Sequence, residues 1–321
     1  MKVGIYFDLR NPPQWRGDWS RLYGFTLEMC EEAERLGADS VWFSEHHFFE
    51  DGYLPQPLTM AAAAATRTRR VRVGTAVVIA PLRRAVQLAE EAAIVDLISN
   101  GRLELGVGAG YRPVEFEAFD ADMEQRYRTT DAMVGRLREL WSGGKVLPPP
   151  AQDRMPIWLG YGGPQGARRA GRMGEGLLSV DRELVEPYLA GLAQGGHPAE
   201  AARMAGSLPV FTTDDPERDW ATVSRHHAYQ WDSYRRYMTE GSAAAPPRAI
   251  DPERSRAHGL APGMGNLLYG TPEDNAPAIR AHLAGMPVET VFFWVSLAGM
   301  SEEMVAAHVR TICRDLRPLL A

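Results

Sequence analysis

Short apolar segments alternate with longer amphipathic segments along the whole chain. The first apolar segment is 3–7, and in residues 19–36 apolar side chains then recur every three or four positions, as on the buried face of a helix. The further segments with strand-like composition are the start of 38–48, 71–80, 102–107, 157–160, 176–179, 208–212 and 290–297. Eight strands alternating with helices predict an α/β fold, a (β/α)8 TIM barrel forming one domain over 1–321. The evenness of the alternation favours this barrel over a doubly wound sheet with an appended domain.

Residues 241–268 interrupt the pattern after the seventh predicted strand. They are rich in Ala, Pro and Gly and show no clear period. An insertion of this length is long for a barrel loop, and such loops are commonly lids or disordered segments. We therefore predict a mobile lid over 241–268. Because reactive groups of TIM barrels lie at the C-terminal ends of the strands, candidate chemistry is sought there.

Composition narrows the class of protein. The chain is 45% hydrophobic and 24% charged with a net charge of −6, which favours a soluble globular protein and argues against nucleic acid or an anionic membrane surface as partner. No apolar stretch approaches the roughly 20 residues of a membrane span, and the N-terminus lacks the pattern of a signal peptide. Two cysteines are too few for a disulfide framework or a structural zinc site. We expect a cytoplasmic protein.

Three ionisable side chains, Glu45, His46 and His47, end the second predicted strand. Neighbouring side chains on an extended strand point in opposite directions, so His46 and His47 are not expected to hold one metal ion, and we predict no metal site. Two interpretations of His46 remain open. It acts as a catalytic acid or base, or its imidazole is merely hydrogen-bonded to the backbone at a strand end.

Two glycine-rich runs follow predicted strands, at 106–110 and 160–166. The first has the spacing GxGxG and is not a dinucleotide fingerprint, but both runs offer exposed backbone amides to a ligand. The second precedes a helix, an arrangement that suits a phosphate group. Each run alone is typical of a tight turn, whereas two of them after adjacent strands favour a phosphate-bearing cofactor. The alanine run 61–65 fits either interior packing or a subunit interface.

Several of these segments, in this order and spacing, resemble the luciferase-like flavin monooxygenases, the family of bacterial luciferase and alkanesulfonate monooxygenase. The resemblance spans nearly the whole chain. Its strongest pieces are Ser44-Glu45-His46-His47-Phe48, Val73-Gly74-Thr75-Ala76-Val77-Val78, Gln87-Leu88-Ala89-Glu90, Gly101-Arg102-Leu103 with the glycine run, Trp231-Asp232-Ser233-Tyr234 and Gly270-Thr271-Pro272-Glu273. The family folds as a (β/α)8 barrel and is commonly dimeric.

The resemblance implies particular site residues. His46 corresponds to the catalytic histidine and Glu45 to the carboxylate before it, while Ala76-Val77 falls on a non-prolyl cis peptide that lies against the flavin ring. The positions implied for cofactor binding are Thr75, Ala76, Val77, Gly108, Ala109, Gly110, Tyr161, Gly162, Gly163, Pro164 and Gln165. At Ala109 the luciferase has an arginine for the phosphate. The possible replacements are backbone amides or one of Arg112, Arg126, Arg128 and Arg168.

The implied function is that of a two-component monooxygenase. A separate NAD(P)H:flavin reductase would supply reduced FMN, which would oxygenate a small organic substrate through a flavin hydroperoxide, with His46 as acid or base. The resemblance also implies a homodimer through the helices that contain Ala61 and Leu88. Two alternatives are a deazaflavin-dependent oxidoreductase of the same superfamily, which transfers hydride, and a non-catalytic flavin-binding protein. The substrate stays open among aldehydes, ketones, sulfonates and natural-product intermediates.

Overall fold

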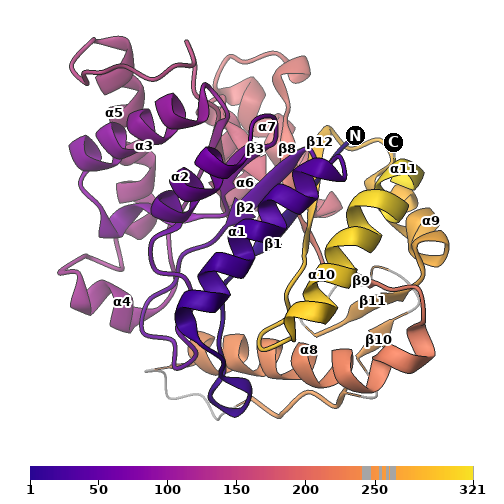
Figure 1. Ribbon diagram of the computed structural model, residues 1–321. Coiled ribbons are helices and arrows are strands. Elements are labelled where there is room, and N and C mark those ends of the chain that lie inside the picture. The colour runs from indigo at the N-terminus through magenta and orange to yellow at the C-terminus, as the bar shows by residue number, and fades with distance from the viewer. Residues whose placement is uncertain (241–246, 253–254, 258–259, 261–264, 321) are drawn as a thin grey trace.

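Eight parallel strands close into a barrel (Figure 1). The computed structural model describes residues 1–240, 247–252, 255–257, 260 and 265–320. The strands follow one another around the barrel in the order β3, β2, β1, β12, β8, β7, β6, β5, and pairing of β3 with β5 closes it. Their bounds are β1 Lys2–Phe7, β2 Ser40–Phe43, β3 Arg72–Thr75, β5 Leu103–Gly108, β6 Ile157–Gly160, β7 Gly176–Leu178, β8 Met204–Leu208 and β12 Val288–Trp294.

Helices surround this barrel, and the long helix α8 runs across the end where the strands finish (Figure 1). Their bounds are α1 Trp19–Arg35, α2 Pro57–Arg67, α3 Ala85–Ser99, α4 Pro113–Ala118, α5 Arg126–Ser142, α6 Gly163–Arg172, α7 Val185–Gln194, α8 Pro216–Met238, α9 Pro272–Leu283, α10 Glu302–Arg310 and α11 Arg317–Leu320. A π-helical turn over Thr311–Leu316 joins α10 to α11, and short 3-10 helices lie at Pro13–Trp15 (η1), Ala80–Leu82 (η2), Arg182–Leu184 (η3) and Ala199–Ala201 (η4).

The alternation of side chains along each strand divides the core into two parts. In β1, Ile5 and Phe7 point outward into the large apolar core between barrel and helices. Tyr6 points inward and belongs to a smaller cluster that fills the barrel interior with Trp42, Trp158 and Phe292. These side chains fill the barrel interior, and two cavities lie beside the C-terminal ends of the strands.

The predicted barrel is confirmed, with one strand misplaced. The seventh barrel strand is Met204–Leu208 and not 208–212, because the weakly strand-like sequence MAGSL pairs with β7 and β12. Pro209, which has no amide proton to donate, separates it from β9 (Val210–Thr212). β9 instead joins β11 (Leu267–Gly270) and β10 (Arg256–Ala257) in a small parallel sheet. The predicted strand 71–80 is also divided, into β3 and β4 (Val78–Ile79).

The predicted lid 241–268 falls partly outside the described residues, which omit 241–246, 253–254, 258–259 and 261–264. Its described parts contact α8, because the Ile250 amide donates to Asp232 at 2.9 Å and Arg235 donates to the Arg248 carbonyl at 2.8 Å. Its movement stays a prediction. Over the described part of the chain, no helix is long and apolar enough to span a membrane.

Candidate functional site

Two adjoining cavities, each of about 340 Å³, open at the C-terminal ends of the barrel strands. They share wall residues that include Tyr6, Ala76 and Val77. Most of the predicted site residues line one or both cavities: Glu45, His46, Ala76, Val77, Gly108, Ala109, Gly110, Tyr161 and Gly162. Separate segments of the sequence thus meet in one place, at the end of the barrel where TIM-barrel chemistry is found.

The wall between β3 and β4 is formed by the Ala76–Val77 peptide, which is cis, as the resemblance implied. Glycines on two other strands leave room for the Val77 side chain: a Cβ added at Gly108 would lie 2.5 Å from Val77 Cγ2, and one at Gly160 would lie 2.7 Å from Cγ1. Thr75 instead faces β5, where its hydroxyl donates to the Gly106 carbonyl at 2.8 Å. Thr75 therefore fixes the strand pair and does not line the cavity.

His46 is paired with a carboxylate that sequence reasoning missed. Its Nδ1 lies 3.0 Å from Oε1 of Glu115, and the same oxygen accepts the His47 amide at 2.9 Å. On the other side of the ring, Nε2 lies 3.3 Å from the Tyr111 hydroxyl. Burial lowers the pKa of His46, an effect that Glu115 opposes. Burial raises the pKa of Glu115, but the hydrogen bonds from His46 and the His47 amide outweigh it, so that pKa is lowered.

Glu45 contacts His47 rather than His46. Its Oε1 lies 2.9 Å from His47 Nε2 and accepts from Arg83 at 3.0 Å, while Oε2 accepts the Ile79 amide at 3.0 Å. These contacts tie the end of β2 to β4 and η2. His46 and His47 thus point to different carboxylates, as expected for neighbours in extended backbone.

A chain of hydroxyl groups lies beside His46. Tyr53 Oη accepts from Ser44 Oγ at 2.7 Å and lies 3.1 Å from the Tyr6 hydroxyl and 2.7 Å from that of Tyr234 on α8. The His46 ring packs edge-on against Tyr53 with centroids 4.8 Å apart. The resemblance singled out residues 231–234, but the contact of Tyr234 with Tyr53 was not predicted, because the two residues lie 181 positions apart in the sequence.

Buried charged side chains follow the end of β1. Arg10 pairs with Asp51 at 2.7 Å and also donates to Ser233. The carboxylate oxygens of Asp8 accept no hydrogen bond from the described residues, and burial raises the pKa of Asp8 to about 7.

The predicted phosphate turn begins α6. Gly162 is the N-cap, and no side chain caps this helix start, so the amides of Gly163 and Gln165 have no side-chain partner among the described residues. Gly163, Pro164 and Gln165 are exposed. Ala109 is buried. Of the arginines suggested in its place, Arg112 is engaged by Glu240 at 2.6 Å and donates to the His47 carbonyl.

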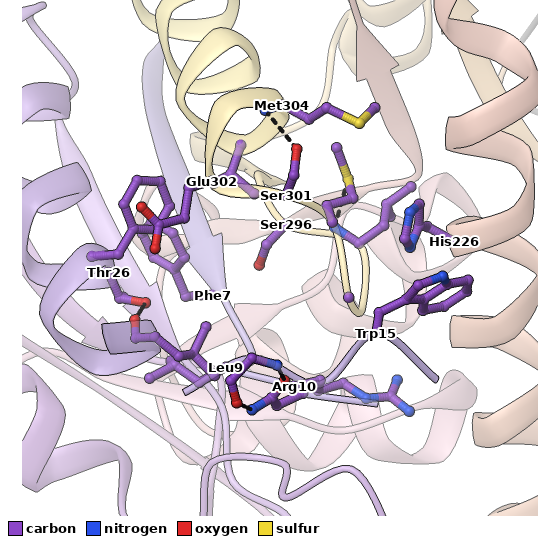
Figure 2. Close-up of a pocket in the computed structure, with 18 of the residues that line it drawn as sticks. Phe7, Leu9, Arg10, Trp15, Thr26, His226, Ser296, Ser301, Glu302 and Met304 are labelled. Atoms are coloured by element: carbon purple, nitrogen blue, oxygen red, sulfur yellow. Dashed lines mark hydrogen bonds between the residues drawn. The ribbon is translucent and has the colours of Figure 1, made fainter. Parts of the chain in front are cut away.

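A third, larger cavity of about 480 Å³ lies outside the barrel wall, between β1, α1, α8 and α10 (Figure 2). Arg10, Trp15 and His226 lie along one side of it, and Ser301, the N-cap of α10, and Met304 lie along another (Figure 2). None of the predicted site residues lines it. His226 is buried, with Nδ1 at 3.0 Å from the Ala298 carbonyl.

The fold and the cavities define the class: a TIM barrel with a buried His–carboxylate pair at the catalytic end. A family model for the luciferase-like monooxygenases matches residues 1–290, and the chain belongs to that family. This membership supports an oxidoreductase that uses a flavin or a related cofactor.

The similar proteins are named for different cofactors and reactions. The chain is 37% identical over 128 residues to the oxygenase component of a flavin-dependent trigonelline monooxygenase of Acinetobacter baylyi, covering 38% of this chain and 35% of that protein. It is 30% identical over 286 residues to an F420-dependent glucose-6-phosphate dehydrogenase of Amycolatopsis mediterranei, covering 83% and 82%. The monooxygenase RslO1 from Streptomyces bottropensis matches over the full length of both chains with a TM-score of 0.81 and 26% identity. The aligned stretch spans less than half of the first curated relatives.

Proposed function

We propose that the chain is the oxygenase component of a two-component, FMN-dependent monooxygenase that oxygenates a small organic substrate. The observation that carries this proposal is the His46–Glu115 pair, which lies in a cavity whose wall includes Ala76 and Val77. A buried titratable pair in the wall of an aromatic cavity suits proton transfer at a place shielded from bulk water.

The residues present fit FMN. The uncapped first turn of α6 offers amides to a phosphate. The Val77 side chain packs against Gly108 and Gly160, and Ala76 and Val77 line both cavities, where a planar ring could lie against them. Tyr161 and Gly162, which directly precede the first turn of α6, line the same cavity as Ala76 and Val77. When bound, reduced FMN would supply the electrons and carry the oxygen. The phosphate would rest mainly on backbone amides, because Ala109 brings no charge.

His46 is the proposed acid–base residue. A carboxylate at Nδ1 holds the proton on that nitrogen, which leaves Nε2 as an acceptor directed toward Tyr111 and the cavity. Glu115 thus orients His46 and stabilises its protonated form. Glu45 is a positioning residue, since its oxygens hold His47, Ile79 and Arg83.

Oxygen uptake tests this function. With reduced FMN supplied by a flavin reductase, the wild type should consume oxygen and form oxygenated product, and His46→Ala should consume oxygen while releasing hydrogen peroxide with little product. His197→Ala, at the far end of the barrel, is the control. Product formation by His46→Ala at the wild-type rate would refute the role of His46.

The second candidate is hydride transfer with a reduced deazaflavin, favoured by the likeness to the F420-dependent dehydrogenase, which covers 83% of this chain. Equilibrium titration with both reduced cofactors separates the two. We expect selective binding of FMN, and selective binding of the deazaflavin with no oxygen uptake would establish the second candidate instead.

A homodimer through α3 is the proposed assembly. α3 buries one side against the barrel, yet four large apolar side chains on its other side are exposed. They are Val86, Ile94, Leu97 and Ile98, between 40% and 49% exposed. An exposed apolar face of this kind is typical of an interface. Sedimentation should show a dimer that Ile94→Arg dissociates, whereas a wild-type monomer would contradict the assembly. The alanines of α2 are mostly buried inside the chain and fit interior packing.

A further inference from the structure

Cationic side chains are missing from the described lining of the barrel mouth. No Arg or Lys is among the described residues that line the two barrel-mouth cavities, whereas Arg10 and Arg21 line the outer cavity. Arg126 lies on the ring of Tyr127, with its Cζ 4.7 Å from the ring centroid, but does not itself line either cavity. Three other arginines near these cavities, Arg10, Arg83 and Arg112, are bound by carboxylates. These pairs are Arg10–Asp51, Arg83–Glu45, Arg83–Glu91, Arg112–Glu115 and Arg112–Glu240. An anionic substrate group would lose its hydration there without gaining an ion pair.

The phosphate of a cofactor is an anion too, but it would not be disfavoured in the same way. The first turn of α6, which would hold it, is exposed, so a phosphate there stays in contact with water. The restriction on charge applies to the part of the cavity that is lined by buried side chains, around His46.

The hydroxyl chain offers one hydrogen bond to a ligand. Its phenols belong to Tyr6, Tyr53 and Tyr234, and two contacts join them. Two contacts use two of the three phenolic protons, so one proton remains for another acceptor. Burial raises the pKa of all three tyrosines, which therefore stay protonated and uncharged. A carbonyl or hydroxyl oxygen on the substrate is the acceptor that this chain fits.

Aromatic rings form much of the remaining wall. Tyr111 and Tyr127 join the three chain tyrosines in lining the inner cavity, together with the His46 ring. The His46 ring meets Tyr111 edge-on with centroids 5.1 Å apart. Aromatic walls of this kind gain most from stacking and edge contacts with a planar ring.

From this charge balance, hydroxyl chain and wall, we propose that the substrate is an uncharged, planar aromatic compound that carries a carbonyl or hydroxyl group. The inference rests on the proposed function, because it takes the barrel mouth as the place of oxygenation. It separates this chain from members of the same fold whose substrates are sulfonates or carboxylates.

Four probes of one size test the class: 2-acetylnaphthalene, 2-ethylnaphthalene, 2-naphthoate and 2-naphthylmethylammonium. Their dissociation constants are measured by calorimetry on the full chain at pH 7.5, with and without FMN. We expect 2-acetylnaphthalene to bind more tightly than 2-naphthoate by at least about tenfold, and more tightly than 2-ethylnaphthalene by about three- to tenfold. Equal or tighter binding of 2-naphthoate or of the ammonium probe would overturn the proposal, as would the absence of binding by all four.

A conservative variant locates the hydrogen bond. Tyr234→Phe removes one hydroxyl and should abolish most of the preference for the acetyl over the ethyl probe while leaving the discrimination against 2-naphthoate. Tyr23→Phe, on α1 away from both cavities, is the matched control. An unchanged preference in Tyr234→Phe, with Tyr6→Phe and Tyr53→Phe also unchanged, would overturn the assignment.

Failure of the substrate class and failure of the proposed function give different results. Oxygen uptake with reduced FMN and no substrate reports the flavin chemistry alone. Uptake together with a preference for 2-naphthoate refutes only the substrate class. Selective binding of 2-acetylnaphthalene without any flavin-dependent uptake refutes only the monooxygenase.

Discussion

Replacing Asp8 with asparagine is expected to change how the stability of the protein depends on pH. The Asp8 side chain is fully buried, and its oxygens accept no hydrogen bond from the described residues. Burial raises its pKa from 3.8 to about 7, although Arg10 opposes this. Between pH 3.8 and about 7, Asp8 is protonated in the folded protein and ionised in the unfolded chain. The free energy of unfolding that Asp8 contributes is therefore fully present below pH 3.8 and is lost as the pH rises to about 7.

The magnitude follows from the pKa difference. Each pH unit corresponds to about 1.4 kcal/mol, so about three units amount to on the order of 4 kcal/mol, of which roughly 2–3 kcal/mol falls between pH 5 and pH 8. Urea unfolding at both pH values measures the free energy of unfolding. Wild type should lose that amount relative to Asp8→Asn on going from pH 5 to pH 8, and the exposed control Asp153→Asn should follow wild type. Parallel curves for wild type and Asp8→Asn would refute the reasoning.

Two further predictions concern a carboxylate and a helix start. Glu115→Gln removes the charge beside His46, so the pKa of His46 should fall and product formation at pH 7 should drop roughly ten- to hundredfold. NMR titration measures the pKa and a pH–rate profile measures product formation, with the exposed Glu117→Gln as control. An unchanged titration of His46 would contradict the pairing. Thr271→Ala breaks the capping box with Asp274 at the start of α9 and should cost about 1 kcal/mol in urea unfolding, whereas no loss would contradict the cap.

The barrel could be predicted because its strands and helices differ in period along nearly the whole chain. Thr271-Pro272-Glu273-Asp274 is a recognisable helix-start sequence, and in the structure Thr271 is the N-cap of α9. β8 could not be located, because Met, Ala, Gly and Ser have low strand propensity and its position is set by pairing with β7 and β12. Tertiary pairing outweighed local composition there, and the more strand-like 210–212 went to a second sheet.

The sequence predicted which single segments reach the candidate site, but not the contacts between segments that are far apart in the sequence. The end of β2 and both glycine runs do reach the barrel mouth. Glu115 was missed because it lies 69 residues from His46 in sequence, in a stretch between a glycine run and a long helix. Pro113 with an acidic first turn is a helix-start signal that could have found α4, though not its partner. Residues 231–234 carry part of the family resemblance, but the position of Tyr234 at the cavity depends on how α8 crosses the barrel, which the local sequence does not show.

A crystal structure of the protein with bound FMN tests the central claim most directly. The account predicts that the flavin ring lies against Ala76–Val77 within reach of His46, with the phosphate on the first turn of α6. A ring bound in the outer cavity beside Trp15, or a phosphate held away from α6, would contradict it.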